Sequence, residues 1–387
     1  MTALFYCSLV MKILINCLSA VNGGGISYLS NMLPLLMDRF AASEHQCYLL
    51  MMKHQAEWLS TPAENIIWLT DTHRSALRRL LWEKLHLASV VKQNNIERIF
   101  TPYQIHTHIN SALNIVMFRN MEPYTFHNYQ YSLKNKLRNT LLKQMTTASI
   151  KKADRVIAVS DHVCTHINNM LSTSDKVTRI YHGRDTTFSP EPTANDNTIL
   201  ADLGIDYAYI FSCGSLLPYR NCEKIILAYA QLYQQNMLAD DIRLVIAGKS
   251  DDRAYSKMLQ ELISQAGLGK QIIMLGQVDK ASMQSLYRHA SLFVTASETE
   301  ACPNIAIEAM SSGCRIVSSD VLPMPEIFKD AASYYKHGET ATLAQLISQN
   351  MSHSTPTHER LALDRAKDFS WPVCAEQTFE LLVKPAW

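Results

Sequence analysis

The fold is decided by residues 292–318, which read LFVTASETEACPNIAIEAMSSGCRIVS. The stretch begins with Leu292–Thr295 and ends with Arg315–Ser318, both of which are typical of short buried strands. Between them, Pro303 suits the first turn of a helix and Gly313 suits the position just beyond its end. The order strand, loop, helix, strand predicts one unit of a parallel α/β sheet.

The same alternation extends along the rest of the chain in two series of short apolar runs. The first series comprises Ile13–Cys17, Cys47–Met51, Ile66–Leu69, Ile99–Thr101, Ile115–Phe118 and Val156–Val159. The second series comprises Ile210–Cys213, Leu244–Ala247, Ile272–Leu275, Leu292–Thr295 and Arg315–Ser318. Because strands buried on both faces with helices between them are typical of parallel sheets, we expect two α/β domains in tandem.

A polar segment separates the two series. Residues 188–197 read FSPEPTANDN and contain two prolines, a composition typical of a linker. We therefore expect an N-terminal domain over residues 11–187, a linker over 188–198 and a C-terminal domain over 199–370.

The composition excludes several classes of protein. Of the 387 residues 47% are hydrophobic and 18% are charged, and the net charge is +1. Such an apolar chain is not disordered, and its charge balance disfavours a globally basic nucleic-acid binder. The balance hides an asymmetry, since residues 1–190 carry 20 Lys and Arg against 12 Asp and Glu, whereas residues 191–387 carry 16 against 23. The basic half suggests contact with something anionic.

Cysteine usage and the N-terminus indicate the compartment. The nine cysteines are odd in number and include no Cys-x-x-Cys pair, which favours a reduced, cytoplasmic setting. Met1–Val10 is apolar but contains no Lys or Arg, and Lys12 interrupts the run well short of the ~20 residues of a membrane-spanning helix. These ten residues are either native or an upstream start extension.

Two carboxylates bracket the start of the predicted helix. Glu300 precedes it and Glu308 lies in its second turn. In an open parallel sheet ligands bind at the carboxyl ends of strands, and the backbone N–H groups around Asn304 and Ile305 would favour phosphate there. One carboxylate could accept hydrogen bonds from sugar hydroxyls while the other contacts a ribose. The alternative is two ordinary carboxylates near a helix start.

The pattern Glu300-x7-Glu308, with Pro-Asn inside it and Glu-Ala-Met-x-x-Gly at its end, resembles the signature of family 4 retaining glycosyltransferases. The resemblance covers roughly Met11 to Ala375. It implies the GT-B architecture, two Rossmann-like domains with parallel sheets facing an interdomain cleft. It assigns Glu300 to the donor sugar and Glu308 to the nucleotide ribose. It also implies that residues 371–387 form a helix crossing back to the N-terminal domain.

The loop Cys213–Asn221 resembles the segment in which family members usually carry an Arg-Lys pair that neutralises the donor diphosphate. Here Tyr219 and Arg220 occupy those places, so only one of the two cations is kept. The sequence leaves open how strongly this loop binds the donor diphosphate. Gly214 opens this loop and would approach the nucleotide. Lys249, after the next predicted strand, is expected to contact phosphate rather than to be merely solvated.

Two N-terminal segments also resemble parts of the family. Asn22-Gly-Gly-Gly-Ile-Ser27 resembles its glycine-rich loop, in which Gly24 and Gly25 would let a ligand approach the backbone, although a plain strand-to-helix turn fits equally. Arg119-Asn120 stands where relatives often carry His-Asp or Gln-Asn, so a histidine role does not carry over. Asn120 could bond a sugar hydroxyl and Arg119 could meet a phosphate, with a structural loop role as the alternative.

The resemblance implies transfer of a hexose from a nucleotide-diphosphate sugar to a saccharide or lipid-linked oligosaccharide. GDP-mannose is favoured, because the loop around Arg220 resembles mannosyltransferases of bacterial surface polysaccharide assembly, and a UDP-hexose is the other donor considered. No Asp-x-Asp motif follows a predicted strand, so no metal or other obligatory cofactor is expected. Two alternatives stay open: another GT-B enzyme such as a nucleotide-sugar epimerase, and a non-catalytic carbohydrate-binding relative.

Two basic stretches of the sequence could contact a membrane. They are Arg74–Lys84 and Lys134–Lys143, the latter followed by Lys151-Lys152. Leucines and a methionine recur at helical spacing through the second stretch, namely Leu133, Leu137, Leu141 and Met145. Such a helix either packs these residues in the core with a solvated basic face, or lies on an anionic membrane such as the inner face of the plasma membrane.

Overall fold

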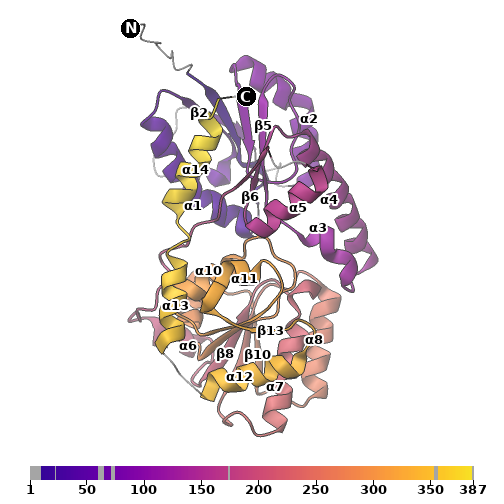
Figure 1. Ribbon diagram of the computed structural model, residues 1–387, viewed down its shortest axis with the longest axis vertical. Helices are drawn as coiled ribbons and strands as arrows, with labels where there is room; N and C mark the ends of the chain where they lie inside the picture. The colour runs from indigo at the N-terminus through magenta and orange to yellow at the C-terminus, as the bar shows by residue number, and fades with distance from the viewer. Residues whose placement is uncertain are drawn as a thin grey trace. The chain divides into compact units, whose positions relative to one another are not determined.

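The computed structural model describes residues 10–21, 23–59, 65–70, 75–172, 175–352 and 356–385. The sequence predictions for residues 1–9, for Asn22 and for Arg74 lie outside these ranges. The chain divides into two compact units (Figure 1). The first unit comprises residues 1–119, 142–183 and 370–387, and the second comprises residues 120–141 and 184–369.

The first unit is built on a parallel sheet of seven strands in the order β3-β2-β1-β4-β5-β6-β7 within the described residues. The strands are β1 Lys12–Asn16, β2 Gln46–Met52, β3 Ile66–Leu69, β4 Arg98–Thr101, β5 Leu113–Phe118, β6 Arg155–Ala158 and β7 Val177–Arg179. The helices are α1 Gly23–Ala41, α2 Ala76–Gln93, α5 Asp161–Leu171 and α14 Trp371–Val383, together with part of α4 Leu133–Lys152. The six strands predicted here are confirmed, whereas β7, an edge strand of three residues, was not predicted.

Apolar side chains of the strands and of α2 form the core of the first unit. Leu14, Leu50 and Ile99 from three neighbouring strands cluster with Leu87 and Val91 of α2. The two apolar residues of α2 are four apart and therefore lie on one face of the helix. The opposite face of α2 carries residues that are exposed.

The C-terminal helix α14 lies beside α1, although about 330 residues separate them in sequence (Figure 1). Trp371 meets the ring of Tyr28 edge-on at 5.7 Å, and Phe379 meets Phe40 at 5.1 Å. A Cβ added to Gly183 would lie 2.2 Å from the backbone nitrogen of Trp371. The close approach of the chain to α14 therefore requires glycine at position 183.

The second unit is built on a parallel sheet of six strands in the order β10-β9-β8-β11-β12-β13. The described strands are β8 Tyr209–Cys213, β9 Arg243–Ala247, β10 Ile272–Gly276, β11 Leu292–Thr295, β12 Ile316–Ser319 and β13 Ser333–Tyr335. The helices are α3 Glu122–Thr125, α6 Asp196–Asp202, α7 Cys222–Gln234, α8 Arg253–Gln265, α9 Lys280–Arg288, α10 Asn304–Ser311, α11 Met324–Phe328, α12 Thr340–Ser352 and α13 Pro356–Ala366, with the first half of α4. The five predicted strands are confirmed, and the short edge strand β13 was not predicted.

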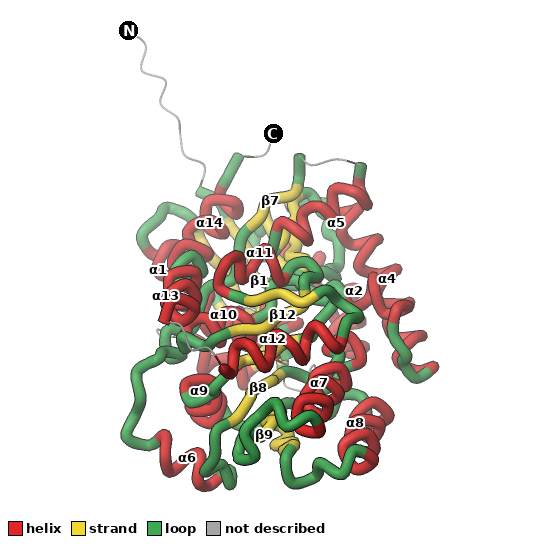
Figure 2. Tube along the Cα trace, turned by 60° about the horizontal axis from the view of Figure 1, so that its bottom comes forward, coloured by secondary structure: helices red, strands yellow, loops and turns green. Residues whose placement is uncertain are grey.

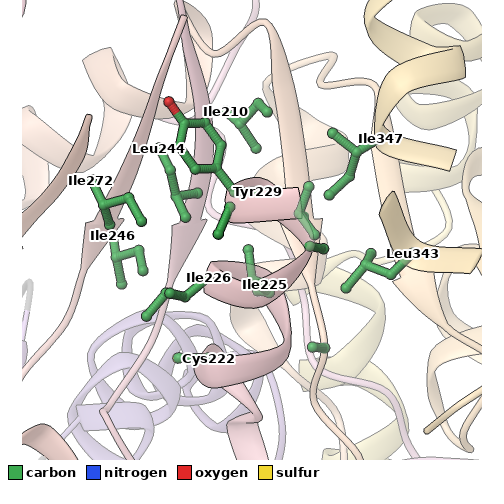
Figure 3. Close-up of a cluster of buried hydrophobic side chains, with 14 of the residues drawn as sticks. Ile210, Cys222, Ile225, Ile226, Tyr229, Leu244, Ile246, Ile272, Leu343 and Ile347 are labelled. Atoms are coloured by element: carbon green, nitrogen blue, oxygen red, sulfur yellow. The ribbon is translucent and has the colours of Figure 1, made fainter. Parts of the chain in front are cut away.

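The core of the second unit gathers around α7 (Figure 3). Ile225, Ile226 and Tyr229 of α7 pack with strand residues such as Leu244 and with Leu343 of α12. Figure 2 shows α7, α8, α9 and α12 surrounding the strands of this unit. The predicted fold class, α/β with two parallel sheets, is confirmed.

Two local features differ from the sequence prediction. Gly23–Gly25 form the first turn of α1 rather than a separate glycine-rich loop, which agrees with the alternative of a strand-to-helix turn. Helix α6 begins at Asp196, inside the segment expected to be a linker, because the Asp196 carboxylate is held by Arg288 at 2.5 Å and by the Thr193 hydroxyl at 2.7 Å. Within the described ranges, no helix combines the length and the apolar character needed to cross a membrane.

Candidate functional site

The carboxyl ends of β9, β8 and β11 lie next to one another in the second sheet. Loops that leave these ends are joined by backbone hydrogen bonds, from Gly214 N to the Ala247 carbonyl at 3.0 Å and from Leu216 N to the Lys249 carbonyl at 2.8 Å. Ligands of parallel α/β sheets bind at this edge. The candidate site is therefore built from the segments that follow these three strands.

Two glycines allow the loops to come this close. A Cβ on Gly248 would lie 1.8 Å from the carbonyl oxygen of Gly214, so a side chain at position 248 would displace the backbone. Gly214 itself has a φ of +125°, which disfavours other residues, and a Cβ there would lie 3.1 Å from the guanidinium carbon of Arg220. The bare backbone at Gly214 therefore provides the space that the Arg220 side chain occupies.

Arg220 and Glu300 form an ion pair at the centre of the site. Arg220 Nη1 lies 2.5 Å from Glu300 Oε1, and the two side chains are only 14% and 10% exposed. Arg220 Nη1 also donates to the Ser297 hydroxyl at 3.3 Å, and its guanidinium lies 5.4 Å from the centre of the Tyr219 ring. The structure thus brings together the predicted residues Gly214, Arg220 and Glu300.

Burial dominates the electrostatics of this pair. Burial raises the pKa of Glu300 above its ordinary value, although the charge of Arg220 and the Ser297 hydroxyl oppose that shift. Burial disfavours the charge on Arg220, but the combined attraction of Glu300, Tyr219 and two nearby thiols outweighs burial and raises the pKa of Arg220. The attraction between the partners therefore opposes the burial that disfavours the charge on each of them.

The loop that carries Glu300 is held by residues to which the sequence patterns assigned no role. Asn221, at a φ of +49°, donates to the Ala296 carbonyl at 3.1 Å. Glu298 N donates to the Tyr219 carbonyl at 3.0 Å, and the Ser319 hydroxyl donates to the Ser297 carbonyl at 2.7 Å. An Asn directly after Arg220 was visible in the sequence, but its left-handed backbone was not.

Glu308 lies on α10 and points towards Tyr287, whose hydroxyl donates to Oε2 at 3.1 Å. The carboxyl is partly buried, and burial raises its pKa to about 7. Asn304 and Ile305, one turn earlier, occupy the first turn of α10 as predicted. The first N–H groups of a helix have no intrahelical acceptor, so this turn presents donors beside the carboxylate.

The remaining predicted residues are placed less centrally. Lys249 is the second residue after β9, but its side chain is 60% exposed and its ammonium pairs with Asp251 at 3.1 Å. Asn120 groups with the second unit, and its side-chain oxygen accepts a hydrogen bond from Glu122 N at 2.9 Å. Gly24 and Gly25 belong to α1 of the first unit.

Residues 120–141 bring further side chains to the Glu300 loop within the second unit. The Tyr129 hydroxyl lies 2.9 Å from the hydroxyl of Thr299, which in turn lies 2.9 Å from that of Thr125. The ring of Tyr129 meets that of Tyr219 edge-on at 6.4 Å. The segment around Tyr129 thus covers the residues on either side of the Arg220–Glu300 pair, a contact that the sequence did not suggest.

The second unit therefore combines a buried cation, two carboxylates of raised pKa and a helix start at one edge of a parallel sheet. A cation and helix-start donors can bind phosphates, and carboxylates accept hydrogen bonds from hydroxyls. Among the described residues, His, Cys, Asp and Glu do not gather in a group of three that could hold a metal ion.

Comparison with known families identifies this arrangement. The family model described as Glycosyl transferases group 1 matches residues 196–364, and that described as Glycosyltransferase Family 4 matches residues 35–188. The chain belongs to the GT-B glycosyltransferases. The family resemblance inferred from the Glu300–Glu308 pattern is thereby confirmed.

Curated glycosyltransferases match over part of their length. The glycosyltransferase MJ1607 of Methanocaldococcus jannaschii is 30% identical over 193 residues, which are 48% of this chain and 47% of that protein. O-antigen chain mannosyltransferase B of Escherichia coli is 24% identical over 265 residues, 66% of this chain and 68% of that protein. The chain thus spans about half to two thirds of the length of these glycosyltransferases.

Solved glycosyltransferase folds match over almost the whole chain. The Anabaena protein Alr3699/HepE, in complex with UDP and glucose, superposes with a TM-score of 0.73 at 17% identity and covers 97% of this chain and 100% of that one. A glycosyltransferase from Rickettsia africae superposes with a TM-score of 0.70 at 16% identity, covering 98% and 100%. At these identities the likeness establishes the GT-B fold.

The buried pair of this glycosyltransferase gives a testable energetic signature. In a double-mutant cycle of Arg220→Gln and Glu300→Gln, we expect a coupling free energy of about 2 kcal/mol, because each single change leaves one buried charge without its partner. Urea unfolding of the four proteins measures it. The control cycle is Lys257 and Glu261, an exposed pair at 3.4 Å on α8, for which less than about 0.5 kcal/mol is expected. Equal coupling in the two cycles would contradict a special role for the buried pair.

Proposed function

We propose that the chain is a retaining glycosyltransferase that moves a hexose from a nucleoside-diphosphate sugar to a saccharide acceptor. The observation that carries the proposal is the Arg220–Glu300 ion pair at the carboxyl edge of the second sheet. A binding site for a sugar diphosphate needs a fixed cation next to an acceptor of hydroxyl hydrogen bonds, and this pair supplies both.

In this proposal Arg220 stabilises charge on the leaving diphosphate. Its Nε atom is buried and has no hydrogen-bond partner within the described chain, so it can donate to a phosphate oxygen without breaking the contact of Nη1 with Glu300. Lys249 and the first turn of α10 at Asn304 and Ile305 would add positive potential. Donors fixed before the reaction lower the barrier because they need no reorganisation as charge develops.

The two carboxylates take separate roles. Glu300, held by Arg220 and Ser297, would orient the donor sugar through its hydroxyls. Glu308, fixed by the Tyr287 hydroxyl, would accept hydrogen bonds from the ribose. Gly214 keeps the backbone beside Arg220 clear of side-chain atoms. Asn120 would contact the sugar or the acceptor.

The domain roles follow from this assignment. We propose that the second unit, residues 120–141 and 184–369, binds the donor, and that the first unit, residues 1–119, 142–183 and 370–387, binds the acceptor. Gly24 and Gly25, at the start of α1, would belong to that first site. Helix α14, Trp371–Val383, would serve as a structural element, as the packing of Trp371 against Tyr28 supports.

We favour GDP-mannose as the donor. Among the relatives of the chain are O-antigen chain mannosyltransferase B of Escherichia coli and the lipopolysaccharide core biosynthesis mannosyltransferase LpcC of Rhizobium leguminosarum. A UDP-hexose is the second candidate, because the Anabaena structure of the same fold is a complex with UDP-glucose. Assembly of a bacterial surface polysaccharide, in the cytoplasm on a lipid-linked acceptor, would suit the first candidate.

The donor proposal predicts which nucleotide stabilises the protein and how pH changes its binding. In a thermal-shift panel of UDP, GDP, ADP and their sugars, we expect GDP and GDP-mannose to stabilise the wild type, by about 2.7 kcal/mol at a concentration of 100 times Kd.

Because the pKa of Glu308 is about 7 and the ionised carboxylate accepts more hydrogen bonds, the affinity for the nucleotide should rise as pH increases through 7. Glu308→Gln should weaken binding and abolish that rise.

Glu261→Gln, an exposed change on α8, is the matched control and should bind as the wild type does. Stabilisation by no nucleotide would contradict the donor site, and an unchanged affinity of Glu308→Gln would contradict the role of Glu308. Release of GDP with formation of a glycoside separates this function from epimerisation. Slow donor hydrolysis that Glu300→Ala abolishes separates it from a non-catalytic relative.

Helix α4 supports a further part of the proposal, contact with an anionic membrane. Leu133, Leu137 and Leu141 lie on one face of α4 and are 86%, 73% and 55% exposed. The alternative in which this leucine stripe packs in the core is therefore wrong. Exposed lysines, Lys136 and Lys143 among them, accompany the stripe along the helix. Leucines flanked by lysines match a surface of apolar chains and anionic headgroups.

Vesicle co-sedimentation tests this contact. We expect the wild type to bind vesicles containing about a third phosphatidylglycerol at low salt and to be released by added salt, since headgroup attraction is screened. The triple change Leu133→Ser, Leu137→Ser and Leu141→Ser should reduce binding, whereas Leu227→Ser, at another exposed leucine, should not. Absence of binding at low salt, or equal binding by the triple variant, would remove the membrane from the proposal.

A further inference from the structure

The first unit contains a cavity of about 240 Å³, whose lining includes Gly25 and Arg119, two residues that the sequence patterns had singled out. It is lined by Ser19, Ala20 and Val21 after β1, by Gly25 of α1, and by Arg79, Tyr103 and Arg119. Two of these residues are arginines, and all of them belong to the first unit. The cavity is thus separate from the Arg220–Glu300 pair of the second unit.

Arg79 is the unusual member of this lining. Its side chain is 9% exposed, and its Nη1 atom is buried without a hydrogen-bond partner in the described chain. Burial lowers the pKa of Arg79, although attraction to Glu83 and Tyr103 opposes that shift. A buried guanidinium N–H without an acceptor is costly, so such a group in a cavity wall indicates an absent anionic partner.

The nearest carboxylate does not satisfy this atom. Glu83 follows Arg79 by one turn on α2, but both of its oxygens are occupied by other donors. Asn16 Nδ2 donates to Oε1 at 3.1 Å, and the Thr107 hydroxyl donates to Oε2 at 3.2 Å. Glu83 therefore attracts the charge of Arg79 without accepting a hydrogen bond from its Nη1 atom.

Two other features of the lining favour an anion. Arg119 follows β5 and places a second guanidinium at the cavity, 5.6 Å from the centre of the Tyr28 ring. Gly25 lies in the first turn of α1, a helix of 19 residues whose dipole is positive at this end. A Cβ on Gly25 would come within 3.2 Å of Ala20, so glycine keeps this wall tight and free of side chains.

We propose that this cavity binds a phosphate group of the acceptor substrate, a proposal that rests on the glycosyltransferase function. Two arginines and a helix start match the three-oxygen face of a phosphate. The donor diphosphate already has Arg220, Lys249 and α10 in the second unit. A volume of about 240 Å³ takes a phosphorylated sugar fragment, whereas pockets for larger ligands start at about 300 Å³. The chain therefore selects a phosphorylated acceptor through Arg79 and Arg119.

Calorimetric titration of the full chain with inorganic phosphate tests this site. The titration is performed alone and with the donor site saturated by the best nucleoside diphosphate. We expect the wild type to bind phosphate in both cases and Arg79→Gln to bind it at least about tenfold more weakly. Arg78→Gln, an exposed neighbour on the same helix, is the matched control and should bind as the wild type does.

Arg119→Gln removes the second cation of the cavity, which follows β5 rather than lying on α2, and should also weaken phosphate binding. This variant therefore tests the proposal even if Arg79→Gln fails to fold. Absence of phosphate binding by the wild type, or wild-type affinity in both variants, overturns the proposal. A parallel loss of nucleoside diphosphate affinity in Arg79→Gln assigns the phosphate to the donor and overturns the acceptor assignment. Because phosphate binding is read without glycosyl transfer, failure of the donor panel leaves this result interpretable.

Discussion

The ion pair between Arg220 and Glu300 is the interaction on which the candidate site depends. It places a cation and a carboxylate 2.5 Å apart where neither is well hydrated. Two glycines permit it: Gly214 leaves room for the guanidinium, and Gly248 lets the next loop lie against Gly214. Asn221 and backbone hydrogen bonds then tie the loop of Arg220 to that of Glu300.

A buried pair of this kind adds little net stability, because desolvation offsets the Coulomb attraction. The ion pair instead fixes a cation and a carboxylate at the carboxyl edge of the second sheet. The second half of the chain is acidic overall, with 16 Lys and Arg against 23 Asp and Glu, so a cation for the donor diphosphate must be local. The basic excess of the first half now has two locations, the exposed lysines of α4 and the arginines of the small cavity.

Much of the fold was predictable, because short apolar runs that alternate with longer amphipathic stretches indicate buried strands with helices between them. The eleven predicted strands are present, whereas β7 and β13 were missed, since a three-residue edge strand has too few residues to show a pattern. The position of the Glu300 loop and of Asn304 at the carboxyl edge of the sheet followed from sheet topology, whereas the ion pair of Glu300 with Arg220 was not predicted. The role of Arg79 was not predicted, because the sequence of an amphipathic helix does not show which of its arginines is buried by tertiary packing and which is solvated. The exposure of Leu137 was unpredictable for the converse reason, since periodicity cannot show which face of a helix is left uncovered.

The central claim is that the carboxyl edge of the second sheet holds a nucleoside diphosphate. A crystal structure of the wild type with the nucleotide that stabilises it most tests this directly. The predicted result is a diphosphate within hydrogen-bond distance of Arg220 and the first turn of α10, with the ribose against Glu308. A nucleotide bound elsewhere, or bound at this edge with its base in place of the diphosphate, would contradict the claim.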